Sequence, residues 1–214
     1  MKIFLSGPSG VGKTTMANEI SKQYGIPFIQ GSSRVLWDKY KIKSHQHLIE
    51  LCNNDLRFAV DFQYELLEVR KELIKANDSF VTDRSPLDNL VYFLLNVSDR
   101  VDSNETMNYI HECTKSFPEK YIQIFLGLTY GMLHQKGIED DGFRINNIYY
   151  QLMVHNIFKG IIEGNWLDMN MNRFEIIETW DREIRANKTD KLIKHYNDKG
   201  YYSGSLFRSA PGKV

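Results

Sequence analysis

The segment that most constrains the fold is residues 7–14, which read GPSGVGKT. These residues match the pattern G-x-x-x-x-G-K-[ST] in full, and they stand between a short apolar run and a stretch of helical periodicity. Gly7, Gly10 and Gly12 allow backbone N–H groups to turn inward around an anion, and the following helix adds the positive end of its dipole. This strand–loop–helix unit predicts a phosphate-binding α/β protein.

The motif also predicts which groups hold a nucleoside triphosphate. Lys13 is expected to reach the β- and γ-phosphates of ATP, and the Thr14 hydroxyl is expected to bind Mg²⁺. ATP and Mg²⁺ are therefore the expected cofactors. The predicted ATP-binding residues of this segment are Ser9, Gly10, Val11, Gly12, Lys13, Thr14 and Thr15.

Short apolar runs alternate with longer helical patterns along the rest of the chain. This alternation predicts a three-layer α/β sandwich, a parallel five-stranded sheet with helices on both faces. The predicted strands are residues 3–6, 27–30, 79–82, 121–126 and 174–179. The predicted helices are residues 13–24, 44–51, 55–76, 86–96, 103–115, 148–162 and 181–196, with Ser44 and Ser103 as caps. We expect one domain over residues 1–199 and a C-terminal tail at 200–214.

Asp83 closes the third predicted strand, and Arg84 follows it directly. Ligands of open α/β sheets bind beyond the carboxyl ends of the strands, so both side chains are expected to face the phosphate-binding loop. We assign Asp83 to the Mg²⁺ shell or to orienting the attacking oxygen. Arg84 suits a phosphate or hydroxyl of the acceptor, because guanidinium groups contact phosphates in bidentate fashion. The alternative is a surface ion pair at a helix start.

Two short stretches resemble nucleoside and nucleotide kinases. Asp83-Arg84-Ser85, followed by Tyr92-Phe93, resembles the D/E-R-Y/S segment of thymidylate kinases and deoxynucleoside kinases. Phe62-Gln63, with Arg70 seven residues after the glutamine, resembles the F-Q…R pattern of deoxynucleoside kinases.

This resemblance implies an acceptor site formed by Phe62, Gln63, Arg70, Arg84 and Phe93. In deoxynucleoside kinases the glutamine hydrogen-bonds the base, the arginine lies nearby, and an aromatic ring at the spacing of Phe93 lies over the base. Seven residues make two helical turns, so Gln63 and Arg70 are expected on one helix face. Residues 139–144, EDDGFR, resemble the D-D-G-x-R stretch of nicotinamide-riboside-kinase-like P-loop proteins, including NadR-type enzymes.

Residues 31–34 bear on the choice between two acceptor classes. A nucleoside hydroxyl benefits from a general base, whereas a monophosphate is already anionic and needs cationic groups. Deoxynucleoside kinases resemble one another in a glutamate just past the second strand, but here that place, residues 31–34, reads GSSR, and no carboxylate follows the strand before Asp38. Arg34 suits an acceptor phosphate, as in thymidylate kinases. The sequence therefore favours a (deoxy)nucleoside monophosphate kinase over a nucleoside or nicotinamide riboside kinase, in which Asp83 would serve as base.

Residues 127–147 contain several glycines and are predicted to form a lid, because a kinase must keep water from the transferred phosphoryl group. Arg144 is assigned to the γ-phosphoryl group. The alternative is a surface pair of Arg144 with Asp140 or Asp141. In related kinases the region at the start of the last predicted helix flanks the adenine, and this resemblance implies that Arg182 or Arg185 stacks on the adenine of ATP.

Composition limits the remaining classes. The chain has 27 basic and 27 acidic residues, which argues against nucleic acid as a partner, because such binding relies on excess Lys and Arg. No apolar run approaches the roughly 20 residues of a bilayer span. Cys52 and Cys113 form no CxxC motif, which suits a reducing compartment, so a cytoplasmic protein is expected. The expected partner is a small nucleotide or nucleoside, and a homodimer stays open. An ATP-driven switch and a nucleic-acid kinase are the remaining alternatives.

Overall fold

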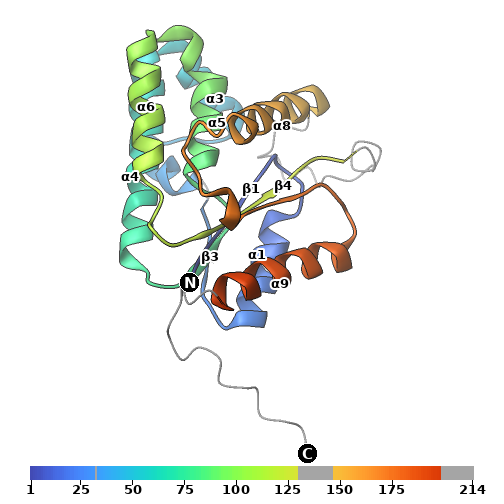
Figure 1. The fold of residues 1–214 in the computed structure, drawn as a ribbon. Helices are drawn as coiled ribbons and strands as arrows, with labels where there is room; N and C mark the ends of the chain where they lie inside the picture. The colour runs from blue at the N-terminus through green and yellow to red at the C-terminus, as the bar shows by residue number, and fades with distance from the viewer. Residues whose placement is uncertain (32, 130–146, 199–214) are drawn as a thin grey trace, which may run out of the picture.

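A computed structural model describes residues 1–31, 33–129 and 147–198 of the protein (Figure 1). Arg144, the central part of the predicted lid and the predicted tail at 200–214 lie outside the described residues. None of the helices in the described ranges combines the length and the apolar character that a bilayer crossing requires.

A parallel sheet of five strands forms the centre of the molecule, in the order β2-β3-β1-β4-β5. The strands are β1 (Lys2–Ser6), β2 (Phe28–Ile29), β3 (Phe80–Thr82), β4 (Ile122–Leu126) and β5 (Phe174–Ile177). In the centre of the sheet, Ile3 of β1 stands opposite Val81 on one side and Ile122 on the other. The predicted α/β sandwich with a parallel five-stranded sheet is confirmed.

Helices cover both faces of the sheet (Figure 1). One face carries α1 (Lys13–Tyr24) and α9 (Arg182–Asp198). The other face carries α4 (Leu56–Ala76), α5 (Pro86–Asn96), α6 (Ser103–Lys115) and α8 (Ile148–Glu163). Shorter elements complete the described part: α3 (His45–Asn54) against α4, and η1 (Ser33–Leu36), α2 (Trp37–Tyr40), η2 (Ser98–Arg100) and η3 (Met171–Arg173).

The strands alternate their side chains between two cores. Ile3 and Leu5 of β1 pack in the core beneath α1 and α9, together with Ile124 of β4. Phe4 points to the opposite face, where its ring meets Phe80 edge-on at a centroid distance of 5.5 Å. This period of two is what a strand buried on both faces requires, and it fixes the direction in which the strand ends present their side chains.

Helix caps follow the sequence with one exception. Ser44 has extended backbone and accepts a hydrogen bond from the His47 N–H, as predicted. The predicted cap of α6, Ser103, is wrong: Asp102 is the N-cap. Asp102 has extended backbone and its side chain accepts from the Glu105 N–H, whereas Ser103 is already helical. Aspartate is as good an N-cap as serine, so the residue with non-helical backbone decides.

Candidate active site

The loop between β1 and α1 has the backbone that its glycines predict. Gly7, Gly10 and Gly12 have φ angles of 139°, 81° and 88°, a region that residues with a Cβ rarely adopt. A Cβ on Gly7 would lie 2.2 Å from the Leu126 carbonyl oxygen, so β4 leaves room for glycine alone. Gly12 is the N-cap of α1, and no side chain caps the helix. The first N–H groups of α1 are therefore available to an anion at the loop.

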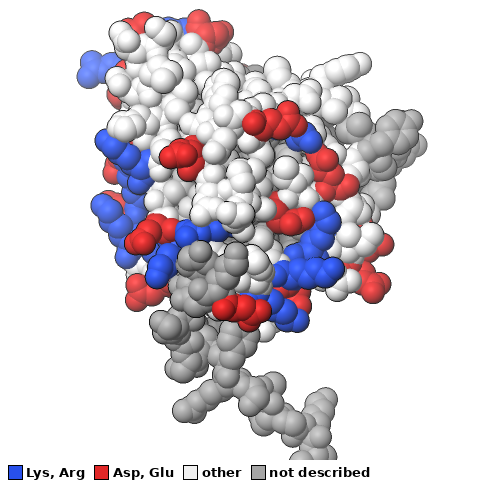
Figure 2. Space-filling view, in the orientation of Figure 1, with Lys and Arg blue, Asp and Glu red and all other residues white. Residues whose placement is uncertain are grey.

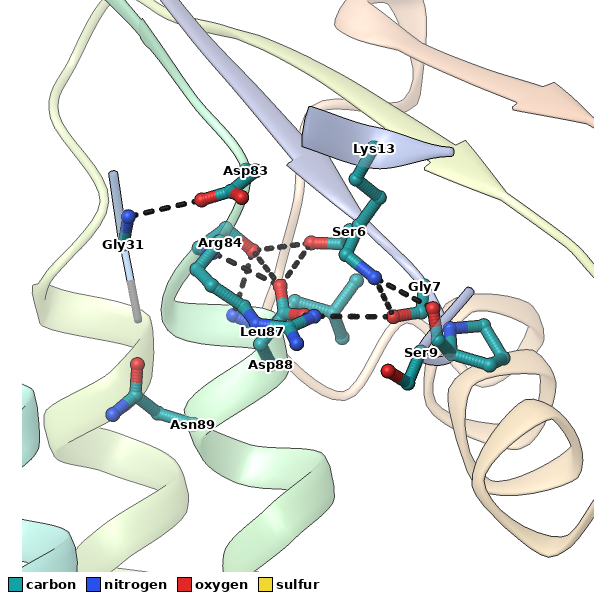
Figure 3. Close-up of polar contacts among 12 residues, drawn as sticks. Ser6, Gly7, Ser9, Lys13, Gly31, Asp83, Arg84, Leu87, Asp88 and Asn89 are labelled. Atoms are coloured by element: carbon teal, nitrogen blue, oxygen red, sulfur yellow. Dashed lines mark hydrogen bonds and ion pairs between the residues drawn. The ribbon is translucent and has the colours of Figure 1, made fainter. Parts of the chain in front are cut away.

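Lys13 lies across the loop that it belongs to. Its Nζ donates to the carbonyl oxygens of Gly7 and Pro8, at 2.7 and 2.6 Å. The side chain is buried, with 6% exposure, and its charged end lies against the backbone of its own loop (Figure 3). This is the position from which an ammonium group can contact phosphates held by the loop.

Asp83 faces the start of α1 from the end of β3. Its Oδ2 accepts from the Thr14 hydroxyl at 2.6 Å, and its Oδ1 accepts from the Gly31 N–H at 2.9 Å. Burial alone would raise the pKa of Asp83, but the hydrogen bonds from Thr14 and Gly31, together with the charges of Arg84 and Lys13, outweigh burial and lower the pKa below its usual value. The carboxylate is thus held ionised beside a hydroxyl, which is the pair of oxygen ligands that P-loop proteins offer to Mg²⁺.

Arg84 follows Asp83 at the end of β3, and its side chain points toward the phosphate-binding loop. Its Nη1 donates to Asp88 Oδ1 at 3.1 Å and to the Gly7 carbonyl at 3.3 Å (Figure 3). Burial alone would lower the pKa of Arg84, but the neighbouring Tyr92, Asp88 and Asp83 raise it overall. The guanidinium group stays charged and is anchored next to the loop.

One cavity of about 470 Å³ joins these groups to residues from the segment after β2 and from η1, α3, α4, α5 and α8. A volume of this size is typical of small-molecule sites. The cavity is lined by the following predicted site residues: Ser9, Gly10, Gly12, Lys13, Thr14, Thr15, Arg34, Phe62, Gln63, Arg70, Asp83 and Arg84. The predicted meeting of the phosphate-binding loop with these acceptor-side residues is therefore present in the described part of the chain.

Helix α4 supplies the wall opposite the loop. Gln63 and Arg70 both line the cavity, as their spacing predicts. The Gln63 Oε1 atom is buried and has no hydrogen-bond partner among the described residues, so it is available to a ligand. Arg70 donates from Nε to Asn89 Oδ1 at 2.5 Å and from Nη2 to the Gly31 carbonyl at 3.2 Å. Burial lowers the pKa of Arg70 to about 10, which leaves it charged near neutral pH.

Phe93 does not line the cavity, so its predicted place over a base is corrected. Its side chain is fully buried and stacks on Tyr109 at a centroid distance of 4.0 Å. Each helical residue turns about 100° from the one before, and on α5 this turn brings Tyr92 to the cavity and Phe93 into the core. Asn89 and Asn96 share the cavity face with Tyr92.

Val11 and Arg185 are joined by a hydrogen bond at the phosphate-binding loop. The Val11 side chain is buried in the core, and its carbonyl accepts from Arg185 Nη1 at 2.8 Å. Arg185 also packs its guanidinium group over Trp180, 5.2 Å from the ring centroid. It lines a second, smaller cavity of about 80 Å³ that also includes Gly12 and Thr15. Arg185 is thus near the loop, and its described contacts support the loop backbone.

Three contributors that hold other residues of the site in place were not predicted from the sequence. Gly31 joins Asp83 to Arg70 through its backbone N–H and carbonyl, and no side-chain pattern reveals a backbone role. Gln151 of α8 accepts from the Ser9 N–H at 3.0 Å, a contact across 142 positions. Asp88 was detectable in principle, because Ser85 and Asp88 form a capping box at the start of α5.

Charge on one face of the molecule is mixed. On the face shown in Figure 2, Lys and Arg side chains are interspersed with Asp and Glu.

The described residues contain no cluster of three or more His, Cys, Asp or Glu side chains suited to a metal ion. The candidate Mg²⁺ ligands are therefore the Thr14 hydroxyl and the Asp83 carboxylate, a site that P-loop proteins complete with phosphate oxygens and water.

The fold and this loop define a class. A family profile described as an AAA domain matches residues 2–157, and the chain belongs to this family. Its fold is also that of solved nucleoside and nucleotide kinases. No protein with a curated description matches the chain.

Solved structures of three kinds have the same fold. Deoxyadenosine kinase from M. mycoides has a TM-score of 0.59 and 18% identity, over 92% of this chain and 100% of that chain. Thymidylate kinase from Candida albicans has a TM-score of 0.54 and 18% identity, over 94% of this chain and 93% of that chain. A NadR protein in complex with NR has a TM-score of 0.60 and 15% identity, over 92% of this chain and 51% of that chain.

Proposed function

We propose that the protein transfers the γ-phosphate of ATP, in the presence of Mg²⁺, to a (deoxy)nucleoside monophosphate. The observation that carries this proposal is the charge of the cavity wall. Four basic side chains and two acidic ones line a single cavity: Lys13, Arg34, Arg70 and Arg84 against Asp83 and Asp88. The wall therefore carries two more positive than negative side chains, a balance that suits an anionic ligand.

The phosphate-binding half of this cavity suits ATP and Mg²⁺. The loop supplies inward N–H groups and Lys13 supplies charge for the β- and γ-phosphates. Thr14 and Asp83, 2.6 Å apart at their oxygens, would hold Mg²⁺, which when bound neutralises negative charge on the phosphates. Because its hydrogen bonds and the nearby charges of Arg84 and Lys13 lower the pKa of Asp83, the carboxylate is ionised and would bind a cation without first losing a proton.

The other half suits an acceptor that is already anionic. Asp83 and Asp88 both accept hydrogen bonds from neighbouring groups, and the described cavity wall offers no further carboxylate. A phosphate oxygen needs no general base to become a nucleophile, whereas a hydroxyl benefits from one. Arg84 would orient the acceptor phosphate toward the loop, and Arg34 would bind it from the side of β2.

The direct test measures ADP release with each ribo- and deoxynucleoside, each corresponding monophosphate and nicotinamide riboside as acceptor. We expect turnover with at least one monophosphate and little ADP without an acceptor. Turnover with nucleosides alone would contradict the monophosphate assignment. Rapid ADP formation without an acceptor would instead indicate an ATP-driven switch.

Arg34 allows a sharper test of the acceptor class. Arg34→Ala is expected to raise the KM of the monophosphate about tenfold or more and to leave the KM of ATP nearly unchanged, because a phosphate–guanidinium contact is lost on the acceptor side only. Arg57→Ala is the matched control, since Arg57 is exposed on α4 and lies outside the cavity. Equal changes in the two KM values would remove the reason for preferring a monophosphate.

A nucleoside or nicotinamide riboside kinase is the second candidate. The structures of deoxyadenosine kinase and of NadR with NR favour it by fold, and Asp83 would then serve as the base near the acceptor hydroxyl. A nucleic-acid kinase is the third candidate, and the mixed surface charge of Figure 2 gives it little support.

A further inference from the structure

Asp88 is a buried carboxylate that joins the start of α5, the end of β1 and Arg84. It is 1% exposed. Its Oδ2 atom accepts hydrogen bonds from the Ser6 hydroxyl and from the Ser85 N–H. Its Oδ1 atom accepts from Arg84 Nη1 at 3.1 Å (Figure 3). Both carboxylate oxygens are therefore engaged, one with uncharged groups of the fold and the other with a cation of the cavity.

Arg84 depends on this contact for its orientation. Its described hydrogen bonds all use Nη1, toward Asp88 and toward the Gly7 carbonyl. The rest of the guanidinium group, Nε and Nη2, has no hydrogen bond within the described residues, and Arg84 lines the cavity. One edge of the guanidinium group is thus fixed to the protein and the other is presented to a ligand.

The fixed edge connects the two halves of the site. The Gly7 carbonyl that accepts from Arg84, at 3.3 Å, also accepts from Lys13 Nζ, at 2.7 Å. Any shift of Arg84 therefore changes its distance from the phosphate-binding loop. A planar guanidinium group delivers paired N–H donors only when its orientation is held, so the anchor matters as much as the charge.

We propose that Asp88 is a positioning residue, which acts through Arg84 to hold the guanidinium group between the phosphate-binding loop and the acceptor. This inference rests on the proposed function for the identity of the acceptor, and on the described contacts for the anchoring itself. The competing explanation is that Asp88 serves only the capping box of α5, in which its side chain accepts from the Ser85 N–H.

The first experiment measures anchoring without any substrate. NMR order parameters of the Arg84 Nε–H bond are compared among the wild type, Asp88→Asn and Ser85→Ala, with Arg84→Lys used for assignment. Ser85→Ala removes the cap hydroxyl and keeps the Asp88 carboxylate. We expect values above about 0.8 in the wild type and Ser85→Ala and below about 0.6 in Asp88→Asn. An equally rigid Arg84 in Asp88→Asn, or equal loosening in both variants, would overturn the proposal.

The second experiment is a double-mutant cycle on the KM of the monophosphate. Asp88→Asn is expected to raise this KM about tenfold in the wild-type background and less than about twofold in the Arg84→Ala background, because residues that act through one another are not additive. The same factor in both backgrounds would show a structural role only. If the wild type phosphorylates no monophosphate, the proposed function fails, while the order parameters still decide the anchoring.

Folding of the variants is checked by thermal unfolding before either experiment. Asn at position 88 keeps the shape of the side chain but brings an amide that donates toward the serine hydroxyls or Arg84. If Asp88→Asn does not fold, Asp88→Ala replaces it in both experiments, since alanine removes the carboxylate without adding a donor.

Discussion

The two halves of the cavity are built in different ways. We call the half formed by residues 7–14 the phosphate side, and the half lined by Arg34, Gln63, Arg70 and Arg84 the proposed acceptor side. The phosphate side consists mainly of one continuous stretch, residues 7–14, whose backbone conformation is set by its own glycines. The proposed acceptor side is assembled from the segment after β2, from α4 and from α5, and its contacts join distant residues. Arg70, for example, bonds Asn89 across 19 positions and Gly31 across 39 positions.

This difference indicates which half of the cavity changes its binding chemistry when single residues are substituted. A loop that binds through main-chain N–H groups presents the same chemistry whenever its glycines are kept. A wall assembled from side chains of several helices changes its chemistry with single substitutions, and its geometry depends on how these helices pack. We infer that the phosphate side sets the reaction class and the acceptor side sets the substrate.

The largest effect is expected at the phosphate side. Lys13→Ala should lower the rate of phosphoryl transfer by about 10²–10³-fold or more, because a charge that contacts the transferred group is lost. Lys22→Ala, a change of the same kind at an exposed position of α1, is the control. ADP release under saturating ATP and thermal unfolding are measured for both. Transfer at the wild-type rate in Lys13→Ala would contradict the role of the loop.

Gly31 tests the link between the two sides. A Cβ at this position would lie 2.6 Å from Arg84 Cβ and 2.9 Å from Arg70 Nη1. Gly31→Ala is therefore expected to cost about 1–3 kcal/mol of unfolding free energy, measured by denaturant titration, together with most of the transfer activity. Gly160→Ala is the control, since a Cβ there meets no atom within 4 Å, and it should stabilise the helix by about 0.5–1 kcal/mol. Wild-type activity in Gly31→Ala would contradict the inference that Gly31 links the phosphate side to the acceptor side.

Asp83 gives the phosphate side a dependence on pH. A carboxyl group whose pKa is lowered by folding stabilises the folded state above its unfolded pKa of about 3.9, and this contribution is lost as the pH falls through the folded value. The wild type should exceed Asp83→Asn in unfolding free energy by a constant amount above about pH 5, and by a shrinking amount below about pH 4. Denaturation at several pH values measures this, with exposed Asp99→Asn as control. A difference independent of pH would contradict the hydrogen bonds assigned to Asp83.

The smallest effect separates two neighbours on α5. Phe93→Leu is expected to lower the unfolding free energy by about 1 kcal/mol, because a core ring that stacks on Tyr109 is replaced by a smaller side chain, and to leave the acceptor KM unchanged. Tyr92→Leu is expected to raise the acceptor KM several-fold, because Tyr92 lines the cavity beside Arg84. A raised acceptor KM in Phe93→Leu with an unchanged KM in Tyr92→Leu would show that Phe93, and not Tyr92, contacts the acceptor.

Local signals allowed much of this fold to be predicted. The ends of α1 at Lys13 and Tyr24 and the start of α5 at Pro86 follow from a glycine on each side and from a proline at the first turn. The short helices over residues 33–40 were missed, because so few residues carry no periodicity.

The site was predictable where the chain is continuous and less so where it is not. Asp83 and Thr14 were expected to meet because parallel strands end at one edge of a sheet. The choice between Tyr92 and Phe93 depends on the rotation of α5 about its axis, which packing against α4 and α6 decides. The role assigned to Arg144 lies outside the described residues and stays a prediction.

The central claim is that one cavity brings ATP and an anionic acceptor together. Its most direct test follows ATP with a radiolabelled γ-phosphate in the presence of Mg²⁺ and the monophosphate that gives the highest ADP release. We predict that the label is recovered in the nucleoside diphosphate, with little in inorganic phosphate. Label found in inorganic phosphate at the same rate with and without the monophosphate would contradict the claim.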